Sequence, residues 1–348
     1  MAAPVVEAGH GRLQHVVLVG AGHAHVEVLR SFAMSRPAGV RLTLITRAWN
    51  ALYSGMLPGV IAGLYPVKEA HIDTRPLAAA AGATVVRAEA VGLNLNSRHV
   101  LCRDLPPVPY DVASFDIGST PNTEGVAGAA DHAIPVKPID GFLSRFEALR
   151  HRVRERAGGS RIVLVGGGAG GIELVLSVER RLRAEATEAD PRSRPLKFAV
   201  VCASATILPE FPASFRRRCR RILQSRDIDL IENARVTAVA PGRVHIGEDR
   251  AVPADEVLWV TEAAAPKWLG PTGLCLDQTR HLGAELIVHE LCLGEPTSWG
   301  SGLAKSNYPE CPASGDGFRC RAHELVDQPQ AQCSRGFQRA IRRGYSVD

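Results

Sequence analysis

Short apolar runs, each followed by a glycine-rich turn and then by a helix-like segment, occur twice along the chain. Residues 16–19 (VVLV) precede the turn 20–25 (GAGHAH), and residues 162–165 (IVLV) precede the turn 166–171 (GGGAGG). Apolar runs of this length, bounded by turn signals, are typical of buried strands in a parallel sheet. The pattern therefore predicts two strand–turn–helix units.

The glycines of these turns allow a close approach between backbone and ligand. A turn of the form GxGxxG places backbone N–H groups at the positive end of a helix, where they bind the pyrophosphate of a dinucleotide. In a chain with 33 glycines, one such turn also fits an ordinary strand-to-helix connection. Two turns in the same context favour two dinucleotide sites.

The first unit departs from the usual pattern at two places. His25 stands where the third glycine belongs, so we expect it to widen the helix–strand contact slightly or to point along the nucleotide, as a structural residue. The strand expected at 40–45 is followed by Thr46 and Arg47 instead of the acidic residue that accepts ribose hydroxyls. These two residues would hold the nucleotide differently.

The remaining periodicity predicts an α/β chain. We expect a helix at about 25–33, strands of a small sheet at 83–88, 90–95 and 100–102, a strand from 110 that runs into a glycine–proline turn at 118–121, and an arginine-rich amphipathic helix at 139–156. The second unit continues into a strand at 198–202, again without a following carboxylate. The second unit therefore also lacks the acid that usually binds a nucleotide ribose.

Length and composition set broad limits. A chain of 348 residues is long enough for two or three domains. It has no apolar stretch of about 18 residues and no hydrophobic segment of a secretory signal near its start, so we expect a cytoplasmic protein with, at most, peripheral membrane contact. The basic run 216–221 (RRRCRR) is interpreted as a solvated helix face, with a cofactor 2′-phosphate or an anionic membrane as alternatives. The net charge of +5 decides nothing about partners, and no nucleic-acid partner is expected.

The eight cysteines form no CxxC pair, and no metal site is expected. A flavin enzyme that reduces disulfides needs two neighbouring cysteines to relay electrons. The early segment 53–58 (YSGMLP), where such a pair would stand, has none. In a flavin enzyme without such a pair, electrons leave the flavin directly, which suits a quinone-like acceptor better than a disulfide.

Several motifs together resemble the FAD-dependent pyridine nucleotide-disulfide oxidoreductase superfamily. They are the two glycine turns, 116–121 (DIGSTP) and 259–261 (WVT). Four further motifs, 22–26 (GHAHV), 53–59 (YSGMLPG), 72–77 (IDTRPL) and 135–140 (PVKPID), look like the subgroup near type II NADH dehydrogenases. Some members of that subgroup are linked or fused to selenophosphate synthetase. The resemblance runs from about residue 15 to residue 277.

The resemblance implies an α/β fold with two Rossmann-like dinucleotide-binding domains, the NAD(P)H domain being inserted in the FAD domain. The expected ranges are 14–150 for the first part of the FAD domain, 158–265 for the NAD(P)H domain, 266–316 for the return segment of the FAD domain, and 317–348 for a diverged or disordered tail. The C-terminal cap of the family would be diverged or incomplete.

The resemblance also implies the residues that hold the cofactors FAD and NAD(P)H. The expected FAD contacts are Gly20, Gly22, His23, His25, Thr46, Arg47, Gly118 and Ser119, and the expected NAD(P)H contacts are Gly166, Gly168 and Gly171. Glu173 matches a family glutamate that points toward the nicotinamide and flavin rings, or else is a first-turn carboxylate that stabilises its helix. Lys137 reaches the flavin or is a surface lysine.

The C-terminal part matches the family least. Only residues 309–316, with Gly315 and Asp316, resemble the turn whose aspartate binds the flavin ribityl chain, and Pro312 stands where a strand should donate a backbone hydrogen bond. Residues 294–314 and 328–348 have compositions closer to loop or disorder. A diverged cap, a changed reading frame and a truncated product all stay open.

These observations lead to three hypotheses. The first is an FAD-dependent oxidoreductase that transfers a hydride from NAD(P)H to FAD and on to a quinone-like acceptor. The second is a catalytically impaired remnant or a regulatory protein that still binds nucleotides. The third is a flavoprotein of selenium or sulfur metabolism that acts with selenophosphate synthetase.

Overall fold

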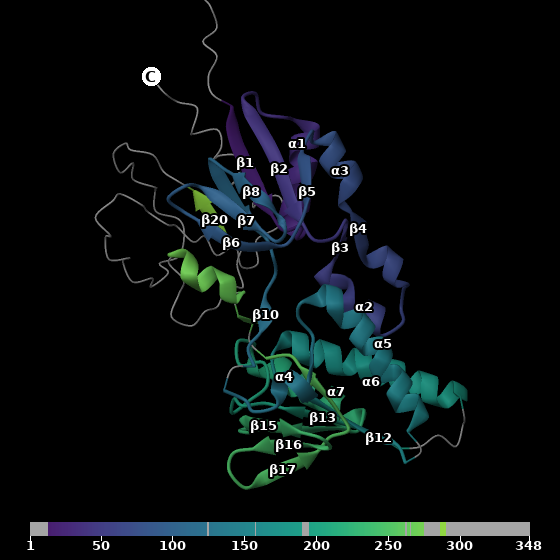
Figure 1. Ribbon diagram of the computed structural model, residues 1–348. Helices are drawn as coiled ribbons and strands as arrows, with labels where there is room; N and C mark the ends of the chain where they lie inside the picture. The colour runs from purple at the N-terminus through teal and green to yellow at the C-terminus, as the bar shows by residue number, and fades with distance from the viewer. Residues whose placement is uncertain are drawn as a thin grey trace, which may run out of the picture. The chain divides into compact units, whose positions relative to one another are not determined.

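The computed structural model describes residues 13–123, 125–156, 158–189, 195–261, 263–264 and 266–274 and the strand 286–289 (Figure 1). The chain divides into two compact units. The first unit takes its described residues from Met1–Ala51, Asp73–Gly118 and Ala265–Asp348, and the second consists of Leu52–Ile72 and Ser119–Ala264. Segment 52–72, which lies inside the predicted range 14–150, thus belongs to the second unit. The domain ranges expected from the sequence (14–150, 158–265, 266–316 and 317–348) remain predictions.

The first unit is built on a five-stranded sheet with the order β20–β9–β1–β2–β5. Its strands are β1 (Gln14–Val19), β2 (Val40–Thr46), β5 (Thr84–Arg87), β9 (Val112–Phe115) and β20 (Leu286–His289). All pairs are parallel except that between β20 and β9. The central strand β1 is buried along nearly its whole length, which is why it reads as a continuous apolar run.

Helices cover one face of this sheet and a small antiparallel sheet covers the other. Helices α1 (His23–Met34) and α3 (Thr74–Ala80) share one hydrophobic cluster with β1 and β2. On the opposite face, the sheet of β6 (Ala90–Asn94), β7 (His99–Cys102) and β8 (Leu105–Pro109) and the 3-10 helix η3 (Lys267–Thr272) share a second cluster with β1 and β9.

The small sheet corrects one prediction. The segment expected at 83–88 forms β5 at the edge of the parallel sheet, where it pairs with β2. The third strand of the small sheet is instead β8 (LPPVP), whose three prolines argue against a strand but are tolerated at an edge. Local periodicity identifies a strand but does not say which sheet it joins.

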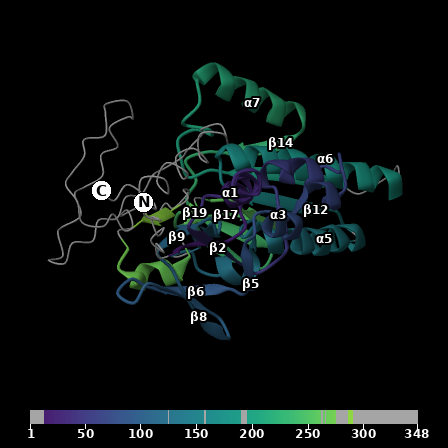
Figure 2. The same ribbon diagram turned by 90° about the horizontal axis from the view of Figure 1, so that it is seen from above.

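The second unit contains a parallel five-stranded sheet with the order β11–β18–β12–β13–β14. Its strands are β11 (Ile134–Pro135), β12 (Ser160–Val165), β13 (Leu196–Val201), β14 (Ile228–Ile231) and β18 (Glu256–Trp259). Helices α5 (Ile139–Glu155), α6 (Ala169–Ala189) and α7 (Ala213–Ser225) contribute to one hydrophobic cluster with this sheet, and α7 lies along β14 (Figure 2).

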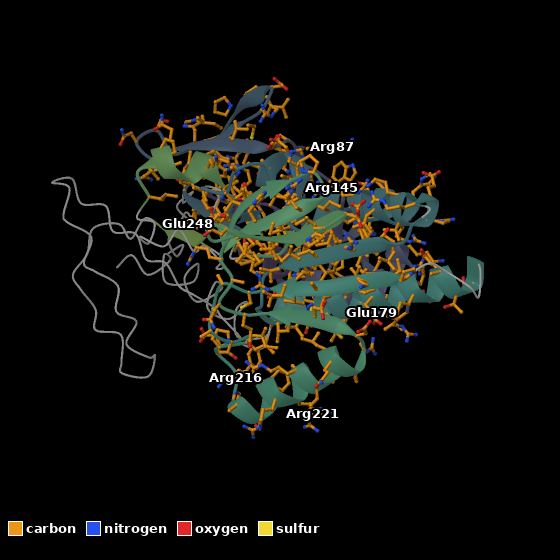
Figure 3. The ribbon with its side chains drawn as sticks, turned by 90° about the horizontal axis from the view of Figure 1, so that it is seen from below. Arg87, Arg145, Glu179, Arg216, Arg221 and Glu248 are labelled. Atoms are coloured by element: carbon orange, nitrogen blue, oxygen red, sulfur yellow. The ribbon has the colours of Figure 1, made fainter. Side chains whose placement is uncertain are left out.

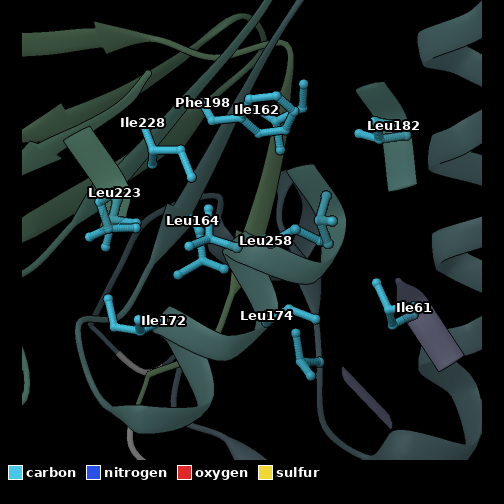
Figure 4. Close-up of a cluster of buried hydrophobic side chains, with 14 of the residues drawn as sticks. Ile61, Ile162, Leu164, Ile172, Leu174, Leu182, Phe198, Leu223, Ile228 and Leu258 are labelled. Carbon is cyan, nitrogen blue, oxygen red and sulfur yellow. The ribbon is translucent and has the colours of Figure 1, made fainter. Parts of the chain in front are cut away.

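Segment 52–72 joins the core of the second unit through the short helix α2 (Leu57–Ile61). Ile61, which is 1% exposed, belongs to the same cluster as Leu174 and Leu182 of α6 (Figure 4). The opposite face of the sheet packs against α4 (Ala129–His132) and the antiparallel strands β15 (Val236–Ala240), β16 (Arg243–Ile246) and β17 (Arg250–Pro253).

Among the short elements, β3 (Asn50–Leu52) pairs with β4 (His71–Asp73), and β10 (Thr120–Pro121) pairs with β19 (Ala263–Ala264). The segments η1 (Ser54–Met56) and η2 (Val67–Ala70) are 3-10 helices. Within the described ranges, no helix has the length and apolar character needed to cross a bilayer.

The two units repeat one plan. The strand order β9–β1–β2–β5 corresponds to β18–β12–β13–β14. Along the chain, a three-stranded antiparallel sheet comes directly before β9 in the first unit and directly before β18 in the second. The registers also correspond, because Val19 pairs with Phe115 and Val165 pairs with Trp259. The predicted α/β fold with two Rossmann-like halves is confirmed.

Candidate functional site

The first glycine turn connects β1 to α1 through a tight approach to β9. Gly20 has φ +92°, and a Cβ added there would lie 2.1 Å from the carbonyl oxygen of Asp116. The backbone N–H of Gly22 donates to the same carbonyl at 3.3 Å. Only glycine fits at position 20, because both its φ and the neighbouring backbone exclude a side chain.

The carboxylate of Asp116 lies inside this turn. It accepts hydrogen bonds from the backbone N–H groups of Ala24, at 3.1 Å, and of His25, at 3.4 Å. A Cβ added to Gly22 would lie 2.0 Å from one of its oxygens. Gly22, the N-cap of α1, provides no side chain for these donors, so Asp116 caps the helix from β9.

The His25 ring is directed into the fold and not along the turn. It is 1% exposed, with Nδ1 2.6 Å from the carbonyl oxygen of Gly20 and Nε2 2.9 Å from Oγ of Ser114. A carbonyl only accepts, so Nδ1 donates and Nε2 accepts from the hydroxyl of Ser114. Burial lowers the pKa of His25, with the nearby Asp116 carboxylate opposing the shift. At this position only the backbone N–H is directed toward the turn.

Four other predicted FAD contacts are His23 in the turn, Thr46 and Arg47 at the end of β2, and Gly118 after β9. Burial lowers the pKa of His23, while the charge of Asp116 acts in the opposite direction. The buried hydroxyl of Thr46 donates to the carbonyl of Ala48 at 2.8 Å, and the neighbouring Arg47 is exposed. Gly118, with φ +71°, has open space around it.

Arg87 is a residue that sequence reasoning missed. It ends β5 directly beside Thr46 in the sheet, and its side chain is exposed (Figure 3). Both residues lie at the carboxyl edge of parallel strands, where such folds bind nucleotides. Assigning segment 84–87 to the parallel sheet would have identified it.

The second glycine turn has the same backbone geometry but an open interior. Gly166 has φ +132°, and its added Cβ would lie 2.2 Å from the carbonyl oxygen of Val260. An added Cβ on Gly171 would lie 2.1 Å from the carbonyl oxygen of Gly166, whereas one on Gly168 would meet nothing within 4 Å. The first turn of α6 contains no acidic residue. These features fit a pyrophosphate at the N-terminus of α6.

Buried contacts and hydrogen bonds support this turn from beneath. A Cβ on Gly167 would lie 2.4 Å from Sγ of the buried Cys202, and the carbonyl of Gly167 accepts from the N–H of Leu208 at 2.9 Å. Arg220 donates to the hydroxyl of Thr206 and to Glu232, both at 2.7 Å. The loop after β13 is therefore fixed by hydrogen bonds.

The basic run 216–221 forms part of α7. Arg216 donates to the backbone carbonyl of Phe211 at 2.9 Å, and Arg217, Arg218 and Arg221 are exposed. Figure 3 labels Arg221 on the outer side of the helix. This arrangement fits the solvated helix face that the sequence predicts.

A cavity of about 180 Å³ lies in the second unit beside the second turn. Its lining includes Glu173 of α6, Lys137 after β11, and Trp259 at the end of β18. Lys137 is exposed along its side chain, and its Nζ donates to Oγ of Ser119 at 2.7 Å. Desolvation lowers the pKa of Lys137. The structure thus brings Lys137 and Glu173 to one cavity.

The alternative role of Glu173 as a first-turn carboxylate is wrong. Helix α6 begins at Ala169, so Glu173 is its fifth residue. A carboxylate beyond the first turn gains little from the helix dipole. Its exposed side chain lines the cavity instead.

The remaining predicted site residues, Gly315 and Asp316, lie outside the described residues. Cys102, Cys202 and Cys219 are free thiols. No group of three side chains suited to hold a metal occurs in the part of the chain that the structure describes.

Comparison with known proteins decides the family. The model of the pyridine nucleotide-disulphide oxidoreductase family matches residues 14–280. The chain belongs to this family. The family assignment confirms the resemblance stated for the sequence, and FAD and NAD(P)H are the cofactors of the family. The open cradle of the second turn fits the pyrophosphate of such a cofactor, whereas the carboxylate of Asp116 fills the cradle of the first turn.

Individual relatives are distant. The chain is 22% identical over 252 residues to the NADH dehydrogenase-like protein YutJ of Bacillus subtilis (strain 168). The aligned region covers 71% of this chain and 64% of the relative. The fold is similar to NDH2 from Plasmodium falciparum in complex with NADH, with a TM-score of 0.64, 17% identity, and coverage of 73% of this chain and 56% of NDH2.

A similar likeness extends to the sulfide:quinone oxidoreductase of Aquifex aeolicus, with a TM-score of 0.63, 16% identity, and coverage of 77% of this chain and 63% of that protein. The chain therefore spans less than two thirds of the length of each of these relatives of the family.

Proposed function

We propose that this chain is a flavoprotein oxidoreductase that transfers a hydride from NAD(P)H to FAD and passes the electrons to a quinone-like or other non-disulfide acceptor. The observation that carries the proposal is the pair of glycine turns at equivalent places in two repeated units. In each turn, a glycine with positive φ packs against the residue that follows the neighbouring parallel strand. Gly20 packs against Asp116, which follows β9, and Gly166 packs against Val260, which follows β18. Membership of a family whose cofactors are FAD and NAD(P)H supports the assignment of one dinucleotide to each turn.

We assign the second turn to NAD(P)H. The N-terminus of α6 offers backbone N–H groups that no acidic side chain of the first turn competes for. The open space at Gly168 lets a pyrophosphate approach, while Gly166 and Gly171 keep the helix close to β12. When both cofactors are bound, the nicotinamide supplies the hydride and the flavin accepts it.

We place the nicotinamide end in the cavity lined by Glu173, Lys137 and Trp259. Apolar walls from Val136, Leu174 and Val260 keep water away from a bound ring. Ser119 holds the ammonium of Lys137 in place. Glu173 orients the ring or its carboxamide from the second turn of α6. Neither residue has to transfer a proton for a hydride to move.

The proposed acceptor follows from the cysteines. Segment 53–58 contains no cysteine, and the described thiols Cys102, Cys202 and Cys219 form no pair. A disulfide acceptor would need a neighbouring pair to relay electrons. The name of one structural neighbour, sulfide:quinone oxidoreductase, supports a quinone. We further propose a cytoplasmic location, with peripheral contact to a membrane that holds the quinone.

The acceptor is tested by steady-state oxidation of NADH and NADPH by the purified full chain supplied with FAD. We expect turnover with a short-chain ubiquinone analogue and none with oxidised glutathione. Turnover with the disulfide would contradict the proposal, and turnover with neither acceptor would contradict a quinone as the acceptor. Turnover that appears only after addition of selenophosphate synthetase would instead favour the third hypothesis from the sequence, a flavoprotein that acts with that partner.

A second candidate, a nucleotide-binding protein without turnover, is favoured by one observation. The carboxylate of Asp116 uses N–H groups of Ala24 and His25, which an FAD pyrophosphate would need. A chain that binds NAD(P)H but retains no FAD at any concentration tested would support this candidate.

A further inference from the structure

The two glycine turns differ at one pair of equivalent positions. Asp116 follows β9 and Val260 follows β18, and each donates its backbone N–H to the last residue of the neighbouring first strand, Asp116 to Val19 at 2.8 Å and Val260 to Val165 at 2.9 Å. The first glycine of each turn also packs against the carbonyl oxygen of this residue. An acidic residue therefore stands in the first unit where the second has an apolar one.

We propose that Asp116 is a resident anion in the phosphate cradle of the first turn and that it weakens FAD binding there. This inference rests on the proposed function, since it concerns the turn assigned to FAD. Asp116 is a specificity-determining residue in this account, because it makes the two otherwise similar turns unequal toward a pyrophosphate.

The position of the carboxylate carries the inference. Its oxygens accept from the backbone N–H groups of Ala24 and His25 and fill the space beside the Cα of Gly22. These N–H groups are the donors that a helix N-terminus offers to a pyrophosphate. The same space at the second turn, beside Gly168, is open. A pyrophosphate and the carboxylate cannot both occupy the first cradle.

The charges nearby do not cancel that of Asp116. Within the described residues Asp116 forms no ion pair, and burial lowers the pKa values of both His23 and His25, although the charge of Asp116 opposes this shift. The favourable partners of the carboxylate are thus backbone N–H groups. A pyrophosphate would have to displace it, and the two anions would repel each other at short range.

The test is a titration of the full chain, stripped of flavin, with FAD, followed by flavin fluorescence. The variant Asp116→Asn keeps the size of the side chain and an oxygen for the helix N–H groups but removes the charge. We expect it to bind FAD at least tenfold more tightly than the wild type. Without FAD, it should also unfold at a lower temperature, because a charged cap interacts more strongly with the helix.

Asp73→Asn is a matched control. Asp73 is also an aspartate cap in the first unit, and it accepts from the N–H of Arg75 at 3.0 Å, but it caps α3 and not the glycine-turn helix. This variant should lower the unfolding temperature and leave the affinity for FAD unchanged. The control separates loss of a helix cap from loss of charge in the cradle.

The reciprocal change tests the same idea at the second turn. Val260→Asp places a carboxylate at the position equivalent to Asp116, and we expect it to weaken NADH binding at least tenfold. Val260→Asn introduces an uncharged side chain of nearly the same size as aspartate, and it should weaken NADH binding much less. Nucleotide fluorescence measures both, and no readout depends on turnover.

The outcomes separate the inference from the proposed function. Tighter FAD binding by Asp116→Asn together with weaker NADH binding by Val260→Asp supports the inference. Equal or weaker FAD binding by Asp116→Asn, with FAD bound by the wild type, overturns the inference and leaves the proposed function standing. Absence of FAD binding by the wild type and all variants overturns both.

Discussion

The Nδ1 atom of His25 donates a hydrogen bond to the carbonyl oxygen of Gly20 across a distance of 2.6 Å. This bond joins the first turn of α1 to the end of β1. In the second unit the equivalent contact is direct, since Gly171 packs its Cα against the carbonyl of Gly166. A buried imidazole therefore provides in one turn the closure that a glycine provides in the other.

Replacing His25 by glycine, the residue usual at this position, should destabilise the protein. His25→Gly removes a buried ring and places glycine in a helix. It also leaves the Gly20 carbonyl and the Ser114 hydroxyl without their hydrogen-bond partner, so we expect the free energy of unfolding to fall by about 3 kcal/mol. Ser114→Ala removes one hydrogen bond and should cost about 1 kcal/mol. Urea denaturation measures both, and a stability of His25→Gly equal to that of the wild type would refute this role of the ring.

Two glycines of the second turn should respond differently to alanine. Gly166→Ala forces a Cβ to 2.2 Å from a carbonyl oxygen at φ +132°, so we expect a loss of about 3 kcal/mol or more. Gly168→Ala meets open space and should leave the unfolding temperature nearly unchanged. It should nevertheless weaken NADH binding at least tenfold, because the methyl group enters the pyrophosphate cradle.

Gly158→Ala is the control for this pair, because its added Cβ also meets nothing within 4 Å and it lies before β12 and outside the turn. It should change neither stability nor affinity. Unchanged NADH affinity in Gly168→Ala would show that the cradle is not the nucleotide site.

His15 should make stability depend on pH. Burial first and the Arg41 guanidinium second lower its pKa from 6.5 to about 4. Arg41 donates to Nδ1 at 2.7 Å, and Nε2 is 2.8 Å from Oγ1 of Thr43, so the neutral ring with its proton on Nε2 fits the site.

The unfolded chain binds a proton at His15 below pH 6.5, and the folded chain binds it only below about pH 4. The contribution to the free energy of unfolding is therefore fully present above pH 6.5 and falls as the pH drops toward 4, by about 3 kcal/mol in total. His15→Gln should flatten this part of the pH profile, measured by urea denaturation between pH 7 and pH 4. Profiles that stay parallel would rule out His15 as the cause.

Glu173 should affect hydride transfer more than cofactor retention. Glu173→Ala removes a carboxylate from the cavity, so we expect flavin reduction by NADH to slow at least tenfold in stopped-flow measurements, with bound flavin unchanged. Glu188→Ala, an exposed glutamate near the far end of α6, should have the rate of the wild type. Equal rates for the two variants would remove Glu173 from the site.

The sequence predicted the elements whose pattern is local. The buried runs at 16–19 and 162–165 lie in β1 and β12, and the expected helix at 139–156 is α5, Ile139–Glu155. Strongly periodic segments of this kind carry their own signal. The first helix starts at His23, two residues earlier than expected, because helix ends depend on capping contacts that the pattern does not contain.

Features that depend on distant segments were not predicted. The carboxylate of Asp116 reaches the first turn because β9 pairs with β1, although the two are more than 90 residues apart in the chain. Segment 52–72 belongs to the second unit because Leu57 and Ile61 pack with α6. Arg87 lies beside Thr46 through sheet register. Strand pairing and packing of this kind have no signature in the local sequence.

The most direct test of the account is the visible absorbance spectrum of the purified, desalted full chain, reconstituted with FAD where needed, before and after anaerobic addition of NADH and then NADPH. We expect flavin bands that bleach with at least one of the two nucleotides, and the nucleotide that bleaches them is the hydride donor. A colourless protein that takes up no FAD, or a bound flavin that neither nucleotide reduces, would contradict it.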